Sequence, residues 1–177
     1  GASNKAFVMM QDLMANVTDY KDEAQIKAYL SKILRKEAFD KSGLIYGIGH
    51  AVYTLSDPRT KLLTKYAHDL SVECGQEDLY NLYLSVERLA PEVFHEVKKS
   101  DKIVCANVDF FAGLIYSMLG IPTELFTPIF ACARIAGWSA HRIEELVSGG
   151  RIMRPAYKSV KKRRSYDDFD SRKNILG

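Results

Sequence analysis

The chain has 177 residues, of which 47% are hydrophobic and 27% are charged. This length and composition are typical of a globular protein with one good core, or with one domain and part of another. The 25 basic and 22 acidic residues leave a formal net charge of only +3. Nucleic-acid binding needs a larger excess of positive charge over the surface, so we expect no nucleic-acid partner.

The sequence contains no segment typical of targeting or membrane insertion. Its first residues, 1–6, resemble neither a signal peptide nor a transit sequence. The most apolar segment, 125–147, is interrupted by Arg134, His141 and Arg142, and its apolar runs are shorter than the roughly 20 residues of a membrane span. The three cysteines are odd in number and widely spaced, as reduced packing residues of a cytosolic protein are. We expect a cytoplasmic protein without a membrane segment or a metal site.

Apolar residues recur at helical spacing along most of the chain, which predicts a mainly α fold. The clearest patterns predict helices over 6–17, 26–34 and 62–70. The pattern over 79–89 runs up to Pro91, which should either begin a new helix or kink this one. Only 103–105 suggests extended chain, so we expect no sheet beyond a short bridge.

The ends of several helices are marked in the sequence. Asp22-Glu23 places acidic charge where the second helix begins, and Asp57-Pro58 is a cap followed by proline in the first helical turn. Gly120 separates two apolar helices, and Gly149-Gly150 ends the last one. This last helix, 123–148, is apolar on nearly every face and must be enclosed. The chain therefore either self-associates or is part of a larger body.

A glycine-rich turn, Gly47-Ile48-Gly49, precedes His50 and is followed by Arg59. A turn without side chains lets backbone approach a ligand closely, and an imidazole suits proton or hydrogen-bond transfer near neutral pH. The turn does not match the dinucleotide or phosphate-loop patterns, and a lone G-x-G is more often a plain turn between helices. An anion-binding site and a structural turn both remain open.

Several charged residues further along the chain have two interpretations. Asp109 precedes two aromatic residues and is either a helix N-cap or a general base. Arg134 lies in the apolar helix, where it meets an acidic side chain or an anionic ligand. Arg154 is a surface arginine by default. With His50 and Arg59 they would form a site for a dicarboxylate or keto acid if they converge, which the spacing leaves open.

Taken together, these segments resemble the citrate synthase family over nearly the whole chain. The motifs that carry the resemblance are Gly47-Ile48-Gly49-His50 with Asp57-Pro58-Arg59, Asn107-Val108-Asp109-Phe110-Phe111-Ala112-Gly113, Phe126-Thr127-Pro128-Ile129-Phe130 leading to Ala133-Arg134-Ile135-Ala136-Gly137-Trp138, and Arg154-Pro155. Their order and spacing make the resemblance specific. It implies a multi-helical citrate synthase-like fold, with a small catalytic and coenzyme A-binding domain over 1–120 and a C-terminal segment of the large domain over 121–177.

The resemblance also implies a function and roles for particular residues. The family condenses acetyl-coenzyme A with oxaloacetate to citrate, an acyl transfer of the tricarboxylic acid cycle that needs no metal and no permanently bound cofactor. His50 would polarise the oxaloacetate carbonyl, and Asp109 would take a proton from the acetyl group. Carboxylates of oxaloacetate would be held by Arg59 and Arg134, with Arg154 reaching the neighbouring subunit's site in a homodimer. Contacts to coenzyme A would come from Leu44, Tyr46, Gly47, Ile48 and Gly49.

The chain departs from the family pattern at a few points. A second catalytic histidine of the family lies in a segment resembling His-Gly-Gly-Ala, and Gly1-Ala2-Ser3-Asn4 resembles the residues that follow it. We therefore expect a C-terminal fragment that is inactive alone. Thr54 and Ala156 stand where many relatives carry basic residues. The alternatives are a fragment of a 2-methylcitrate synthase, which uses propionyl-coenzyme A, and a helical binding or interaction module without catalysis.

Overall fold

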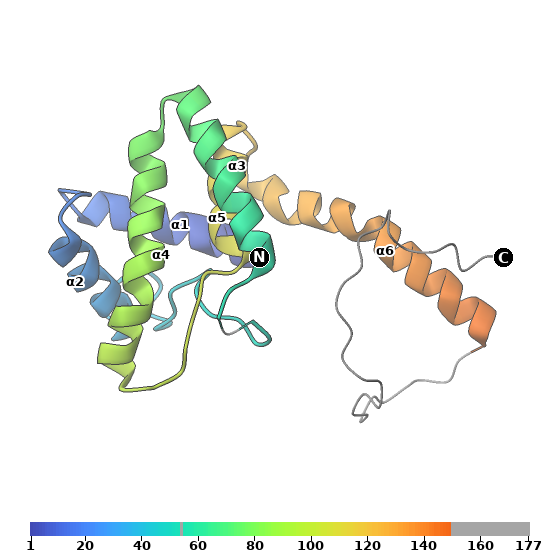
Figure 1. The fold of residues 1–177 in the computed structure, drawn as a ribbon, viewed down its shortest axis with the longest axis horizontal. Helices are drawn as coiled ribbons and strands as arrows, with labels where there is room; N and C mark the ends of the chain where they lie inside the picture. Colours follow the sequence, from blue (N-terminus) through green and yellow to red (C-terminus); the bar gives the residue numbers. More distant parts are fainter. Residues whose placement is uncertain (54, 150–177) are drawn as a thin grey trace, which may run out of the picture. The chain divides into compact units, whose positions relative to one another are not determined.

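The computed structural model describes residues 1–53 and 55–149 of the chain (Figure 1). Its elements, in chain order, are α1 (Ala2–Asn16), α2 (Glu23–Leu34), α3 (Pro58–Cys74), α4 (Glu77–Lys98), α5 (Val108–Met118), the 3-10 helix η1 (Thr123–Leu125) and α6 (Phe126–Ser148). Extended pairing within the described part is limited to an isolated antiparallel bridge between Ile48 and Ala106. The mainly α fold predicted from the sequence is confirmed.

The chain divides into two compact units, Gly1–Ile135 and Ala136–Gly177. The first unit contains α1 to α5, η1 and the first turns of α6. The division into domains at 120 that the resemblance implies stays a prediction. Arg154, Thr54 and Ala156 lie outside the described residues.

Helix α5 lies at the centre of the first unit. It packs against α1 and α3, while α4 packs against α2 and α3 (Figure 1). The side chains of Phe110, Phe111 and Leu114 on α5 are fully buried. The other fully buried large side chains come from α1, α2, α4 and the start of α6, and include Met9, Met10, Leu13, Ile26, Leu30, Tyr83, Leu89 and Phe126. The apolar faces that the sequence period predicts are buried in α1, α2 and α4, whereas Leu62 and Tyr66 of α3 are exposed. The N-terminus of α5 is fixed from several sides.

Side-chain caps begin α2, α3 and α5. Asp22 accepts the backbone N–H of Ala24 at 2.9 Å, which confirms the predicted start of the second helix. Asn107 caps α5 by accepting the N–H of Asp109 at 3.0 Å. The interpretation of Asp109 as the cap is therefore wrong, because Asn107 holds that position. The Asp109 carboxylate lies in the first turn, where it is available for other contacts.

Helix α4 runs without a break through Pro91, so this proline does not begin a new helix. A proline inside a helix removes one backbone hydrogen bond. The surrounding turns bury Leu89, Ala90 and Val93 completely, and this burial offsets the loss.

Helix α6 is not enclosed by the described part of the chain, as expected if the helix is covered only by self-association or in a larger body. Only Phe126 of its residues is buried, between Phe7 of α1 and Tyr116 of α5. Trp138 is 53% exposed and Leu146 63% exposed. None of the described helices is both long and apolar enough to cross a bilayer.

The cysteines also differ from the expectation. All three are free, but Cys74 and Cys132 are exposed, and only Cys105 is partly buried. Their interpretation as packing residues is wrong for the first two, because helical spacing alone does not tell which face of a helix is covered.

Candidate active site

The glycine-rich loop lies directly on the N-terminus of α5. The N–H of Gly49 donates to the carbonyl of Cys105 at 2.7 Å, and the N–H of Asn107 donates to the carbonyl of Gly47 at 2.8 Å. The Asn107 side chain adds a third bond, from Nδ2 to the carbonyl of Gly49 at 2.7 Å. Three hydrogen bonds therefore join residues 47–49 to residues 105–107.

Gly47 is required by this contact. Its φ is +83°, and a Cβ at this position would lie 2.8 Å from both Cα and Cβ of Phe110. Only glycine allows the loop backbone to approach α5 this closely. Within the same loop Leu44 is exposed, and the hydroxyl of Tyr46 donates to Asp40 at 2.7 Å.

The ring of His50 has a defined hydrogen-bonding pattern. Its Nδ1 accepts the backbone N–H groups of Val52 at 3.0 Å and Tyr53 at 3.1 Å. Because Nδ1 accepts, the proton of the neutral ring is on Nε2. The loop thus presents His50 as a donor through Nε2. The ring centroid lies 4.8 Å from that of Tyr53.

Arg59 lies at the start of α3 and is held by Asp57. Asp57 accepts from Nε of Arg59 at 3.0 Å and from Nη2 at 2.8 Å, and its own side chain is fully buried. The hydrogen bond from Arg59 is the main cause that lowers the Asp57 pKa. The guanidinium also lies 5.5 Å from the centroid of the Tyr53 ring, which places it on the same side as the His50 turn.

Asp109 is half-buried in the first turn of α5, and its Oδ1 accepts a hydrogen bond of 2.6 Å from the hydroxyl of Ser3 on α1. The pKa of Arg59 is raised mainly by its hydrogen bond to Asp57, and the negative charge of Asp109 contributes to the same shift. The guanidinium of Arg59 and the carboxylate of Asp109 therefore interact electrostatically. The loop that carries His50, the guanidinium of Arg59 and the carboxylate of Asp109 thus lie at the N-termini of α3 and α5.

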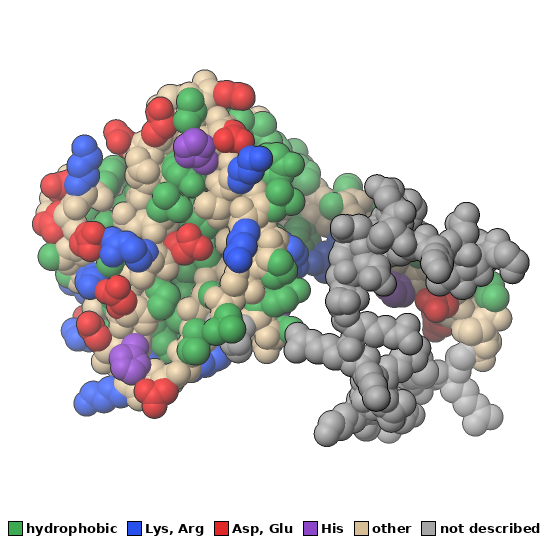
Figure 2. All heavy atoms as spheres, in the orientation of Figure 1, with side chains coloured by type: hydrophobic (Ala, Val, Ile, Leu, Met, Phe, Trp, Pro, Cys, Tyr) green, Lys and Arg blue, Asp and Glu red, His purple; other side chains and the backbone are tan. Residues whose placement is uncertain are grey.

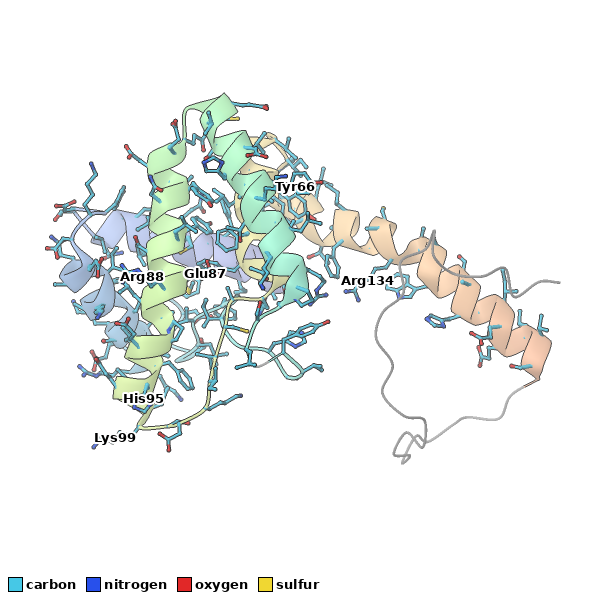
Figure 3. All side chains as sticks on the ribbon, in the orientation of Figure 1. Tyr66, Glu87, Arg88, His95, Lys99 and Arg134 are labelled. Carbon is cyan, nitrogen blue, oxygen red and sulfur yellow. The ribbon has the colours of Figure 1, made fainter. Side chains whose placement is uncertain are left out.

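The structure does not bring Arg134 to this set. Its guanidinium lies 4.3 Å from the Phe130 ring centroid, one turn earlier on α6, and the side chain is exposed (Figure 3). Among the described residues Arg134 forms no ion pair with an acidic side chain, and it makes a cation–π contact with Phe130.

Three residues of the site are not evident from sequence alone. Asn107 and Ser3 contact the loop and Asp109 across long separations, and Tyr53 stacks on His50. The one local signal is the Asn-x-Asp spacing, in which the first residue is a typical cap and the second lies in the first helical turn. No group of three or more potential ligands for a metal ion occurs within 1–53 and 55–149.

The surface of the first unit carries charges of both signs. On the face that Figure 2 shows, basic and acidic side chains are interspersed over α2, α3 and α4. The fold and the site together define a helical domain with acid–base groups and an arginine at two helix N-termini.

Comparisons with known proteins agree with this class. The family described as citrate synthase, C-terminal domain, matches residues 1–156. The chain is 38% identical to the 2-methylcitrate synthase of Shewanella oneidensis over 88% of its own length and 36% of that protein. It is 36% identical to the citrate synthase of Deinococcus radiodurans, over 88% of the chain and 37% of that protein. The crystal structure of citrate synthase from Thermotoga maritima is 28% identical, with a TM-score of 0.63, and the match covers 98% of this chain and 42% of that one.

The chain belongs to the citrate synthase family. It spans a little over a third of the length of the curated relatives that it matches.

Proposed function

We propose that the chain supplies His50, Asp109 and Arg59 to the active site of an acyltransferase that condenses acetyl-coenzyme A with oxaloacetate to citrate. The observation that carries the proposal is the attachment of the Gly47–Gly49 turn to Asn107, because it holds His50 and Asp109 at the same end of α5. Family membership supports the reaction type.

Each of the three side chains has a chemical task that its surroundings favour. Asp109 removes a proton from the methyl group of the thioester, and the resulting carbon attacks the carbonyl carbon of oxaloacetate. His50 donates from Nε2 to the carbonyl oxygen, where negative charge develops. Arg59 binds a carboxylate of oxaloacetate through the part of its guanidinium that Asp57 leaves free. Water then hydrolyses the citryl thioester and releases coenzyme A.

The substrate contacts outside this centre are also proposals. Leu44, Tyr46, Gly47, Ile48 and Gly49 form the loop that would contact coenzyme A, and Leu44 is the exposed residue among them. Arg134 and Arg154 would bind further carboxylate groups, with Arg154 acting in the site of the neighbouring subunit of a homodimer. We expect a cytoplasmic enzyme that has no permanently bound cofactor and that uses acetyl-coenzyme A as a substrate.

A second candidate is the condensation of propionyl-coenzyme A to 2-methylcitrate. It is favoured by the 38% identity to a 2-methylcitrate synthase. The two thioesters differ by one methylene, for which a pocket discriminates by only about 1–3 kcal/mol.

Binding to the 177-residue chain tests the first part of the proposal. We expect isothermal titration calorimetry to detect oxaloacetate and coenzyme A, and the substitution Arg59→Ala to weaken oxaloacetate binding. Arg88→Ala is the matched control, because Arg88 is an exposed arginine of α4 that pairs with Glu23 (Figure 3). A folded chain that binds neither ligand would favour the interaction module.

Turnover tests the second part. The chain is joined to the N-terminal part of the Deinococcus radiodurans citrate synthase, in place of the third that it matches. We expect this fusion to release coenzyme A from an acyl-coenzyme A only when oxaloacetate is present, and the ratio of kcat/KM for acetyl- and propionyl-coenzyme A identifies the substrate. For the 177 residues alone we expect no turnover, because they span little more than a third of each relative. A folded dimeric fusion that is inactive with both thioesters contradicts the proposed function.

A further inference from the structure

The hydroxyl of Ser3 donates to Oδ1 of Asp109 at 2.6 Å. The bond joins the first turn of α1 to the first turn of α5 across 106 residues of sequence. Ser3 is 7% exposed, so water competes little for its hydroxyl. A short bond from a buried hydroxyl to a carboxylate is among the stronger hydrogen bonds in a protein.

The backbone of Ser3 is held against α5 because residue 113 is glycine. A Cβ on Gly113 would lie 3.1 Å from the carbonyl oxygen of Ser3 and 2.9 Å from Cβ of Phe7. The absence of a side chain at this position lets α1 approach α5 closely enough for the Ser3 hydroxyl to reach Asp109.

The neighbouring residue fixes the start of α1 from the other side. Nδ2 of Asn4 donates to the carbonyl of Thr123 at 2.5 Å, and the hydroxyl of Thr127 donates to Oδ1 of Asn4 at 3.3 Å. Ser3 is therefore a donor with a fixed position.

A carboxylate rotates easily about its last side-chain bond, since this torsion has a broad energy minimum. A base that must face the methyl group of a bound thioester loses rate when its orientation is not fixed. One hydrogen bond to one of its oxygens restricts the rotation and leaves the other oxygen free.

We propose that Ser3 is a positioning residue that binds Oδ1 of Asp109, so that Oδ2 is the oxygen that accepts the proton of the acyl thioester. The inference rests on the proposed function. Ser3 does not touch the substrate in this scheme, and it acts only through Asp109.

The first test uses the 177-residue chain with 13C at the aspartate side-chain carboxyl carbons. In Ser3→Ala we expect the NMR resonance of Asp109 to move, while Ser3→Thr, which keeps a hydroxyl, restores its position. Ser117→Ala is the matched control, because it also removes a partly buried hydroxyl. The Ser117 hydroxyl lies on α5 and donates at 2.8 Å to the carbonyl of Leu114, away from Asp109. An Asp109 resonance that Ser3→Ala leaves in place would overturn the inference.

The second test measures turnover in the fusion described above. For Ser3→Ala we expect kcat to fall about tenfold or more, with KM for oxaloacetate unchanged within about twofold, since orientation of the base affects the chemical step and not substrate binding. Ser3→Thr should recover most of the rate, and Ser117→Ala should match the unsubstituted fusion. An active fusion in which Ser3→Ala is equally fast overturns the role of Ser3 alone, whereas an unsubstituted fusion without turnover overturns the proposed function.

Discussion

Asp57 binds the guanidinium of Arg59 with both carboxylate oxygens, at 3.0 and 2.8 Å, although only Pro58 separates the two residues in the chain. The same carboxylate accepts the backbone N–H of Arg59 at 3.0 Å and that of Val108 at 3.2 Å. Since Val108 is the first residue of α5, one buried side chain joins the N-termini of α3 and α5. The arginine and the carboxylate of Asp109 are thereby held relative to each other.

Replacing Asp57 should destabilise the chain and disturb both helix starts. Asp57→Ala removes a helix cap and three further hydrogen bonds to a buried carboxylate, and we expect a loss of about 2–3 kcal/mol in the free energy of unfolding. Urea unfolding followed by circular dichroism measures this loss. The matched control is Asp69→Ala on the same helix, whose side chain is 54% exposed and pairs with His68. It should change the free energy of unfolding by less than about 0.5 kcal/mol, and an equal effect of the two substitutions would contradict the role of Asp57.

Glu87 should make stability depend on pH in the opposite sense to an ordinary paired carboxylate. It lies on α4 toward α3 (Figure 3), where it lines a cavity of about 170 Å³ together with Asp57, Thr60 and Lys61. Burial raises the pKa of Glu87 above its ordinary value of 4.5. The folded state therefore binds the proton more tightly than the unfolded state. The resulting cost to stability is small below about pH 4.5, grows as the pH rises from 4.5 to the raised value, and is complete above it.

The substitution Glu87→Gln tests this pH dependence. At pH 7 we expect it to stabilise the chain by about 1 kcal/mol, because the amide carries no charge to desolvate. The gain should shrink towards zero at pH 4, where Glu87 is largely protonated in both states. Urea unfolding at both pH values measures the difference, with Glu73→Gln on the exposed side of α3 as the control. A gain of the same size at pH 4 would show that the effect of the substitution is not electrostatic.

The helices and their caps were predictable because they depend on residues close in sequence. Asp22 and Asp57 lie directly before the helices that they cap, and the apolar period of α2 agrees with the face that is buried. In α3 the agreement fails, because Leu62 and Tyr66 are exposed. The contacts that form the site were not predictable in this way. Asn107 binds the loop of Gly49 at a separation of 58 residues, and Ser3 binds Asp109 at 106 residues, so no local period reports either contact.

The surface that packs against α6 could not be predicted from the sequence for a related reason. Its composition indicates that the helix must be enclosed, but composition does not name the partner. The expected buried Arg134 is instead exposed beside Phe130. The roles proposed for His50, Arg59 and Asp109 come from the resemblance to the family, and neither the helical period nor the spacing contains them.

Gly47→Ala should separate the cost of a steric clash from the cost of an unusual backbone conformation. The new Cβ would lie 2.8 Å from Phe110 at a φ of +83°, and we expect a loss of about 2–4 kcal/mol in the free energy of unfolding. Gly75→Ala is the matched control, because its φ is +64° and no atom lies within 4 Å of the added Cβ. It should cost only about 1 kcal/mol. Equal losses in the two variants, measured by urea unfolding, would mean that the loop can move away from α5 without penalty.

The exposed apolar face of α6 should cause the 177-residue chain to self-associate. The exposed large side chains of this helix are Ile135, Trp138, Ile143, Leu146 and Val147. A contiguous apolar surface of this kind is stabilised by contact with another apolar surface. Multi-angle light scattering should give an average mass that rises with concentration, and Ile143→Lys should lower it towards that of the monomer. His141→Lys places the same charge on the other side of the helix, so it should leave the association unchanged; a monomer at every concentration would contradict the prediction.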